Sequence, residues 1–258
     1  MTSVVITGAS SGIGEKMAFE TANRGWTPIM LARSYDKLMK SADQIKKDTG
    51  VSPYIFQLDV TDQQGIETTF AEIIETIGPI DVLINNAGFA VFELAHESSM
   101  EIAKSMFQVN VFGAVACTKA VLPKMMERNS GHIIFIASQA GKLATPKSSI
   151  YSATKHALLG YANSLRMELG GTGIQVSTVN PGPIRTPFFD TADETGQYRK
   201  NVERFMLDPE IVAARTIDLI KRPKRELNLP KWMGIGTKIY QLFPGVVERI
   251  AGSQLSKK

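Results

Sequence analysis

Cysteine is almost absent from this sequence. The 258 residues include a single cysteine, Cys117, so the chain cannot form an intramolecular disulfide, which fits a reducing compartment such as the cytoplasm. Cys117 lies in the apolar run 114–117, and we expect it to pack in the core. The three histidines, His96, His132 and His156, are scattered and lack the spacing of metal ligands, so we expect no metal site.

Strong charge imbalance and long hydrophobic runs are also lacking. The chain has 29 basic and 25 acidic side chains, a formal charge of +4, which does not indicate nucleic-acid binding. The first residues show neither the basic start nor the apolar run of a leader, and we expect no stretch to be long and apolar enough to span a bilayer. Repeats and low-complexity linkers are missing as well. One soluble domain over residues 1–258 is therefore expected.

Strand-like and helix-like segments alternate along the chain. The expected strands cover residues 4–7, 27–31, 54–58, 81–84, 132–136 and 174–179. The expected helices cover 12–24, 36–47, 63–77, about 98–128 and 150–169, and another begins at Asp208-Pro209. Ser98 and Glu101 form a capping box for the long fourth helix. The alternation predicts an α/β fold, a Rossmann-like doubly wound parallel sheet with helices on both faces.

A glycine-rich loop follows the first expected strand and opens the first expected helix. It reads Thr7-Gly-Ala-Ser-Ser-Gly-Ile-Gly14. Glycines allow tight turns and close approach of a ligand, and a helix N-terminus offers N–H groups to a pyrophosphate. The spacing Gly-x-x-x-Gly-x-Gly differs from the commoner Gly-x-Gly-x-x-Gly. A simple turn is the alternative, but the placement between strand and helix favours a nucleotide site.

Arg33 and Ser34 come directly after the second expected strand. In folds of this kind that position faces the adenine ribose, where an acidic residue binds the 2′-hydroxyl and an arginine accommodates a 2′-phosphate. The sequence has no acidic residue here before Asp36. Arg33 therefore favours NADP(H) over NAD(H), with an ordinary solvated arginine as the alternative interpretation.

Tyr151 and Lys155 stand four residues apart in an expected helix, so their side chains share one face. A nearby ammonium favours the phenolate, which would make Tyr151 a general acid or base near neutral pH. Alone, such a pair is often an ordinary surface pair. Ser138 precedes it, and Asn85-Asn86-Ala87-Gly88 follows the fourth expected strand, at the edge where open α/β sheets bind ligands. This context favours a catalytic site.

Together these segments resemble the short-chain dehydrogenase/reductase family, in its short single-domain branch. The matching pieces occur in the family's order and are Thr7 to Gly14, Asp59-Val60, Asn85 to Gly88, Asn110, Ser138, Tyr151-x-x-x-Lys155 and Pro181-Gly182. The resemblance implies that Tyr151 donates or accepts the proton, that Lys155 lowers its pKa and binds the nicotinamide ribose, and that Ser138 binds the substrate oxygen. It also implies that Asn110 holds a water linking Lys155 to solvent.

The resemblance further implies a cofactor site along the same edge. Asp59 and Val60 would border the adenine, and the segment after residue 180 would bracket the nicotinamide. With Tyr151 and Lys155, the expected cofactor residues are Gly8, Ser10, Ser11, Gly12, Ile13, Gly14, Arg33, Ser34, Asp59, Val60, Asn85, Ala87, Gly88, Pro181, Gly182, Ile184 and Thr186. Relatives that prefer NADP(H) often carry a basic residue where this chain has Ser11. The preference would therefore rest mainly on Arg33, with Ser10, Ser11 and Ser34 assisting.

Two regions lie outside these motifs. Residues 184–207 lack a clear period and are expected to form a mobile substrate lid. Residues 230–258 carry an apolar stripe broken by glycine and proline, which predicts two short helices that pack over the cleft or against another subunit. A membrane surface is the less favoured alternative for this tail, next to the basic run 221–225. A substrate pocket, or alternatively core packing, is expected of Phe89, Val91, Phe92, Leu143, Phe188 and Phe189.

These observations predict an NADP(H)-dependent oxidoreductase, a carbonyl reductase or alcohol dehydrogenase with a small, apolar substrate, assembled as a homo-oligomer. A non-catalytic dinucleotide-sensing or scaffold protein on the same fold is one alternative, but it would not need Ser138, Tyr151 and Lys155. A sugar-nucleotide epimerase or dehydratase is another. Such enzymes carry a larger C-terminal domain than the roughly seventy residues after Pro181 provide.

Overall fold

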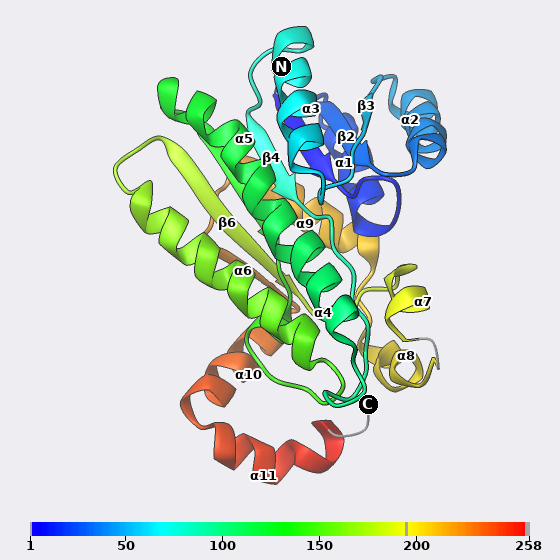
Figure 1. The fold of residues 1–258 in the computed structure, drawn as a ribbon, viewed down its shortest axis with the longest axis vertical. Coiled ribbons are helices and arrows are strands. Elements are labelled where there is room, and N and C mark those ends of the chain that lie inside the picture. The colour runs from blue at the N-terminus through cyan, green and yellow to red at the C-terminus, as the bar shows by residue number, and fades with distance from the viewer. Residues whose placement is uncertain (1, 194–195, 256–258) are drawn as a thin grey trace.

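The computed structural model describes residues 2–193 and 196–255. At its centre is a seven-stranded parallel sheet in the order β3-β2-β1-β4-β5-β6-β7 (Figure 1). Its strands are β1 (Ser3–Thr7), β2 (Thr27–Ala32), β3 (Tyr54–Gln57), β4 (Val82–Asn85), β5 (Gly131–Ile136), β6 (Ile174–Pro181) and β7 (Glu226–Leu229). The predicted Rossmann-like sheet is confirmed. Strand β7 was not predicted, because its sequence Glu-Leu-Asn-Leu lacks the continuous apolar run of the inner strands.

Helices cover both faces of the sheet, and each layer has its own core. Alternate side chains of one strand supply the two cores: Val5 of β1 belongs to one, and Val4 and Ile6 belong to the other. One face is covered by α3 (Gln63–Thr76), α5 (Ala114–Glu127) and α6 (Ser149–Glu168). The opposite face is covered by α1 (Gly12–Asn23), α2 (Tyr35–Thr49) and α9 (Pro209–Lys221) (Figure 1).

The helix expected over residues 98–128 is interrupted. It consists of α4 (Met100–Phe107), a π-helical turn η1 (Gln108–Gly113) and α5. Its N-cap is Ser99, whose side chain accepts a hydrogen bond from the Ile102 N–H, so the predicted capping box at Ser98 is wrong by one residue. Such a cap satisfies a backbone donor that the first helical turn leaves free.

The continuous helical segment 100–127 also corrects our expectation about membrane-spanning stretches. It contains an 18-residue window with a mean hydropathy of 1.3, and it is the one helix in the described part of the chain that is long and apolar enough to cross a bilayer. Of its apolar window, 44% is buried inside the protein. Cys117, Val121 and Met125 pack into the core beneath it, so we interpret it as a core helix whose apolar face covers the sheet.

The chain after β6 is more regular than its sequence indicates. Residues 184–207 include α7 (Phe188–Ala192), α8 (Gln197–Val202) and a 3-10 turn η3 (Glu203–Phe205), and residues 194–195 of this segment lie outside the described residues. Asp208 caps α9 as expected and accepts from the Glu210 N–H at 2.7 Å. The tail forms α10 (Lys231–Leu242) and α11 (Pro244–Leu255), in agreement with the two predicted short helices.

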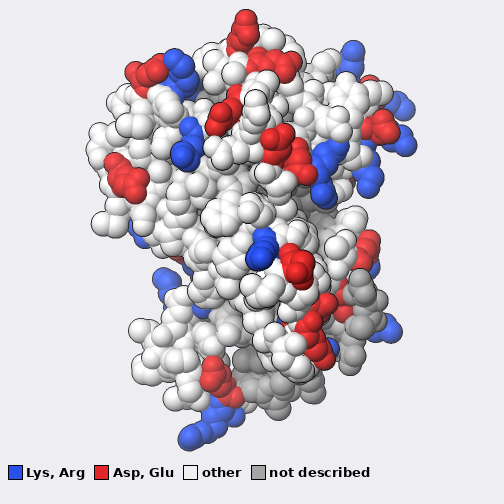
Figure 2. Space-filling model, in the orientation of Figure 1, with Lys and Arg blue, Asp and Glu red and all other residues white. Residues whose placement is uncertain are grey.

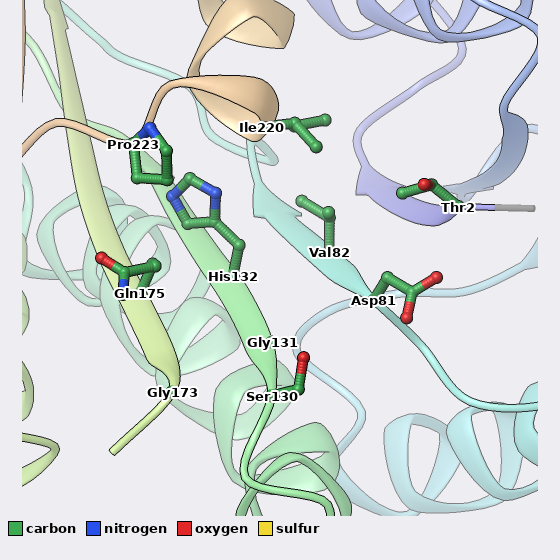
Figure 3. A pocket seen from close by; sticks show the side chains of 10 residues that line it. All are labelled: Thr2, Asp81, Val82, Ser130, Gly131, His132, Gly173, Gln175, Ile220 and Pro223. Carbon is green, nitrogen blue, oxygen red and sulfur yellow. The ribbon is translucent and has the colours of Figure 1, made fainter. Parts of the chain in front are cut away.

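A hollow of about 470 Å³ lies at the amino ends of β4, β5 and β6 (Figure 3). Asp81 precedes β4, Gly131 begins β5 and Gly173 precedes β6, and all three line the hollow. Open parallel sheets bind nucleotides at the opposite, carboxyl ends of their strands. The residues predicted for catalysis and cofactor binding lie at that other edge.

Candidate active site

The glycine loop after β1 and the turn after β4 form one hydrogen-bonded unit. β1 and β4 are neighbours at the centre of the sheet, where the order of the strands reverses. The side chain of Asn86 donates to the carbonyl oxygens of Thr7 and Gly8 at 2.8 and 3.2 Å. The Thr7 hydroxyl accepts from the backbone N–H groups of Asn86 and Ala87 at 2.9 and 3.0 Å. Two loops far apart in sequence are thereby held rigidly at the switch point.

Close backbone approach explains why glycine is needed in this loop. A Cβ atom at Gly14 would lie 2.3 Å from the Gly8 carbonyl oxygen. Gly8 itself has a φ of +65°, and a Cβ there would lie 2.9 Å from the Ala87 Cα. Gly12 faces the Thr186 side chain, to which a Cβ would come within 3.6 Å. The loop, the turn after β4 and the segment after β6 therefore meet, as the predicted cofactor residues require.

The start of α1 fits a pyrophosphate. Ser11 is the N-cap of α1, but its side chain makes no capping hydrogen bond within the described residues. The first N–H groups of the helix therefore remain for a ligand, and the helix dipole favours an anion there. Ser34, the N-cap of α2, is likewise without a side-chain capping bond among these residues.

Ser138, Tyr151 and Lys155 converge at the carboxyl edge of the sheet. Ser138 follows β5, whereas Tyr151 and Lys155 lie on α6. The Ser138 hydroxyl hydrogen-bonds the Tyr151 phenol, and its oxygen accepts from the Ala140 N–H at 3.1 Å. Lys155 Nζ donates to the Ile136 carbonyl at 2.9 Å and lies 5.7 Å from the centroid of the Tyr151 ring. The three side chains thus form one polar group next to Gly88 in the turn after β4.

Burial has the largest effect on the pKa values of this group. It raises the pKa of Tyr151 to about 12, against the opposing effect of the Ser138 hydrogen bond. It lowers the pKa of Lys155 to about 8. The expected lowering of the Tyr151 pKa is therefore wrong in this structure, because each charged form loses its hydration on burial. At neutral pH the phenol keeps its proton and Lys155 is mostly an ammonium.

Asn110 clamps the turn after β4 to α6. It lies on the π-helical turn η1, a type of distortion that often marks functional sites. Its amide nitrogen donates to the Phe89 carbonyl at 2.9 Å and to Thr154 Oγ1 at 3.1 Å, and its oxygen accepts from the Phe89 N–H at 2.9 Å. A Cβ at Gly88 would lie 3.0 Å from Asn110 Oδ1 and 3.7 Å from Lys155 Nζ. The expected water-holding role of Asn110 stays a prediction.

The residues expected at the adenosine end lie beyond β2 and β3. Arg33 is exposed directly after β2, and within the described part of the chain its guanidinium contacts no carboxylate. Asp59 accepts from the backbone and the hydroxyl of Thr61 at 2.9 and 2.8 Å, which orders the loop after β3. Val60 is buried and packs beneath Gly113. A basic side chain therefore lies exposed at the carboxyl end of β2.

The segment after β6 closes on itself. Pro181 is the last residue of β6, and the Gly182 N–H donates to the Leu229 carbonyl of β7 at 2.7 Å. Ile184 and Leu207 form an isolated parallel bridge. This bridge brings together the two ends of the segment predicted to be the lid.

Aromatic side chains cover the Tyr151 ring. Phe92 and Phe188 lie with their ring centroids 6.0 and 5.9 Å from it, and Phe189 packs against both. Phe189 is buried and so is less exposed than the sequence indicated, whereas Phe205 of the same segment is exposed. Phe89 and Val91 join this apolar cluster as expected, whereas Leu143 is not a member of it among the described residues. Sequence reasoning missed Tyr198 as a site residue; its ring lies 5.0 Å from that of Phe92.

A polar network behind Ser138 was also missed. The side chain of Gln139 donates to the Asn180 carbonyl at 2.6 Å, which ties the turn after β5 to the end of β6. Lys142, which lies close to the pocket in sequence, is paired with Glu226 of β7. The charge of Lys142 is therefore neutralised by Glu226 and is not directed at the apolar cluster around Tyr151. The sequence carried no signal for this network, because β7 itself was not predicted.

The geometry defines a Rossmann-like α/β protein with a glycine-rich loop at the switch point of its sheet and a buried Ser–Tyr–Lys group. The profile of a family described as "short chain dehydrogenase" matches residues 2–197. The chain is 32% identical to "Dehydrogenase/reductase SDR family member 7B" of Mus musculus, over 99% of this chain and 81% of that protein. It therefore belongs to the short-chain dehydrogenase/reductase (SDR) family of oxidoreductases.

Other similar proteins match only part of this chain or part of their own length. The chain is 39% identical to "Dehydrogenase/reductase SDR family protein 7-like" of Drosophila melanogaster over 71% of its own length, and the match spans only 57% of that protein. Among solved structures, "The Closed form of serine dehydrogenase complexed with NADP+" superposes with a TM-score of 0.80 at 33% identity, covering 88% of this chain and 94% of the other.

A second solved structure shares the fold alone. It is a short-chain dehydrogenase/reductase from Burkholderia phymatum in complex with NAD, with a TM-score of 0.87 at 23% identity, covering 95% of this chain and 94% of the other. Both nicotinamide cofactors therefore occur among the structural neighbours of this chain.

Proposed function

We propose that this protein is an NADP(H)-dependent carbonyl reductase or alcohol dehydrogenase that acts on small, apolar substrates. The observation that carries the proposal is the convergence of Ser138, Tyr151 and Lys155 next to the turn after β4, which is hydrogen-bonded to the glycine loop. Membership of an oxidoreductase family supports it. The apolar side chains around the Tyr151 ring support an apolar substrate.

The residues of the chain would divide the reaction as follows. The bound nicotinamide supplies or accepts the hydride. Tyr151, protonated at neutral pH, donates its phenolic proton to the carbonyl oxygen in reduction and takes it back in oxidation. The Ser138 hydroxyl hydrogen-bonds the same oxygen, where negative charge develops. The Lys155 ammonium lies close enough to stabilise a tyrosinate formed after proton transfer, and it would also bind the nicotinamide ribose.

The preference for NADP(H) rests on Arg33. Its exposed guanidinium directly follows β2, where a 2′-phosphate would lie, and no carboxylate of the described residues competes for it. The start of α1 and the glycine loop would hold the pyrophosphate. A neighbour with NADP+ bound supports this choice, although another neighbour binds NAD.

The proposal also covers the cellular compartment and the partners of the protein. The only cysteine, Cys117, is buried, and burial raises the pKa of its thiol to about 12. A core thiol of this kind supports a reducing compartment, and we place the protein in the cytoplasm. Family membership supports a homo-oligomer with a small-molecule substrate and no nucleic-acid partner.

A panel of aldehydes and ketones, read by the absorbance of the reduced cofactor, tests the proposal. We expect turnover of apolar carbonyl compounds, with NADPH giving a higher kcat/KM than NADH. A preference for NADH would contradict the assignment of the cofactor. Cofactor binding without turnover of any carbonyl or alcohol would instead support a dinucleotide-sensing protein.

A further inference from the structure

The C-terminal helices α10 and α11 carry an apolar surface that the described part of the chain does not cover. We call this surface the C-terminal apolar face. Its side chains are between 50% and 72% exposed and belong to Trp232, Ile235, Ile239, Leu242, Phe243 and Val246. Four of them, on α10, fall within an arc of roughly 80° at 3.6 residues per turn. They therefore form a continuous stripe along the helix.

This stripe points outward because small residues hold the opposite side of α10 against the protein. Gly234 and Thr237 are buried, and a Cβ at Gly234 would lie 2.8 Å from the Asn228 side chain of β7. Met233 packs against Gly182 after β6, where a Cβ would come within 2.7 Å of its sulfur. The usual arrangement, with the apolar side inward, is thus reversed. The expectation that the stripe packs over the cleft of its own chain is wrong.

The charges beside the C-terminal apolar face are mostly positive. Residues 231–255 contain Lys231, Lys238 and Arg249 against one acid, Glu248, which gives 3 − 1 = +2. Glu248 accepts a hydrogen bond from the Tyr240 hydroxyl at 3.0 Å, which joins α11 to α10. Lys231 and Lys238 are exposed on α10, along one side of the stripe. An anionic surface would attract these cations.

Aromatic rings extend the face toward the lid. Trp232 pairs with Phe205 of η3 at 6.3 Å between centroids, and Arg204 lies over the Phe205 ring at 4.6 Å. Tryptophan and phenylalanine with flanking cations are the composition of helices that lie in the plane of a bilayer surface. The two helices project from one end of the molecule (Figure 1), and few charged side chains lie over that end where α10 is seen (Figure 2).

We propose that the C-terminal apolar face docks on the surface of an anionic phospholipid bilayer, with Trp232, Ile239 and Leu242 inserted below the headgroups and Lys231 and Lys238 at the phosphates. Membrane contact was the less favoured interpretation of the sequence. The outward orientation of the stripe now supports it. The docking site is separate from the Ser138–Tyr151–Lys155 group, so the proposal of membrane binding does not depend on the proposed reaction.

Flotation of the full chain with lipid vesicles tests this proposal. Wild type should float with vesicles of phosphatidylcholine containing about one-third phosphatidylglycerol, and binding should weaken with phosphatidylcholine alone or at high salt. Ile239→Ser combined with Leu242→Ser should reduce the affinity at least roughly tenfold, because two apolar anchors are lost. Lys231→Glu with Lys238→Glu should abolish the preference for anionic lipid. All four side chains are exposed, so circular dichroism should show an unchanged fold.

Met167→Ser is the matched control. Met167 is exposed on α6, away from the face, and its loss should leave vesicle binding unchanged. Failure of the wild type to float, or equal binding by the Ile239→Ser/Leu242→Ser variant, would overturn the proposal. Light scattering that shows a wild-type dimer converted to monomer by the same variant, without vesicle binding, would assign the face to a second copy of the chain instead.

Discussion

At the scale of single residues, the site depends on two ionisable groups whose pKa values are shifted by burial. Burial raises the pKa of Tyr151, so the phenol keeps its proton and can donate it at neutral pH. Burial lowers the pKa of Lys155, so its ammonium loses a proton more easily than that of an exposed lysine. Ser138 is placed to donate to the phenol, since its oxygen already accepts from the Ala140 N–H. Proton transfer therefore depends on Tyr151 itself.

Tyr151→Phe should lower kcat by 10²–10⁴-fold, the usual effect of losing a general acid. Cofactor affinity should change little, because the ring still packs against Phe92 and Phe188. Steady-state kinetics and cofactor titration measure the two effects separately. Tyr161→Phe is the control, since Tyr161 lies on the same helix but packs against Phe135. Near-normal turnover of Tyr151→Phe would remove Tyr151 from the mechanism.

Arg33→Ala should weaken NADPH binding by roughly 10–150-fold, the equivalent of one charge-assisted hydrogen bond of about 1.5–3 kcal/mol. NADH lacks the 2′-phosphate, so its affinity should change far less. Fluorescence titration of both cofactors against wild type and variant gives the comparison. Lys37→Ala, one turn into α2, is the control for a general loss of positive charge. Equal effects on the two cofactors would contradict a phosphate contact.

At the scale of elements, the glycine loop and the predicted lid, residues 184–207, are held in different ways. The loop is cross-linked to the turn after β4 by the Asn86 side chain and the Thr7 hydroxyl. The lid consists of helices of five and six residues, too short to be stable alone. It is anchored at its base by the Ile184–Leu207 bridge. The close packing of the glycine loop and the opening of the predicted lid can therefore be tested in separate experiments.

Gly14→Ala should destabilise the protein by about 1–3 kcal/mol, because the added methyl overlaps the Gly8 carbonyl and the Asn86 side chain. Nucleotide affinity should fall with it. Gly160→Ala is the matched control on α6, where no heavy atom of the described residues, apart from the backbone of the same helix and the two neighbouring residues, lies within 4 Å of the added methyl. That change should stabilise the helix by about 0.5–1 kcal/mol. Urea unfolding measures the free energy of unfolding of both variants. Equal values for Gly14→Ala and Gly160→Ala would contradict the argument that the added methyl at Gly14 overlaps its neighbours.

The lid should open and close around the ligands. Phe188 and Phe92 lie against Tyr151, so a substrate that reaches the phenol must displace aromatic rings. Hydrogen exchange should show low protection in residues 184–207 without ligands and a gain on adding NADPH with a substrate analogue. The long helix α9 serves as the internal reference. Equal, high protection of the segment in both states would show a rigid element instead of a lid.

At the scale of the whole molecule, the parallel sheet separates the two ends of the protein. The carboxyl edge carries the candidate site, and the amino edge carries the hollow of Figure 3, which includes His132. Burial lowers the pKa of His132 to about 4, and its ring hydrogen-bonds Ser177 at 2.8 Å. This end of the sheet is therefore sensitive to acid, although it is remote from Tyr151.

Stability should fall as the pH drops from about 6.5 to about 4, because the unfolded chain binds a proton at His132 that the folded protein excludes. The contribution of this one group is roughly 3 kcal/mol, present above the unfolded pKa and lost toward the folded one. Urea unfolding across this range should show a shallower loss for His132→Asn than for wild type. His96→Asn, a change at an exposed histidine, is the control. Identical pH profiles of wild type and His132→Asn would contradict the prediction.

Local patterns were enough to predict the order of elements and the chemistry of the loops. Continuous apolar runs indicated the inner strands, and glycine spacing indicated a nucleotide loop, because both depend on neighbours in sequence. Tyr151 and Lys155 were recognised from helical spacing for the same reason. Strand β7 and the turns within residues 184–207 escaped notice, since partly polar or aperiodic segments are ordered by contacts with distant residues.

Long-range packing set the remaining properties. The Tyr151 pKa was predicted to fall because a cation lies four residues away, but burial beneath Phe92 and Phe188 outweighs that neighbour. The apolar stripe of α10 was visible in the sequence, yet its direction was not. Gly234 and Thr237 fit against the protein where larger side chains could not, and this contact turns Trp232, Ile239 and Leu242 outward. Burial and direction depend on which distant surfaces meet, and a one-dimensional pattern does not contain that information.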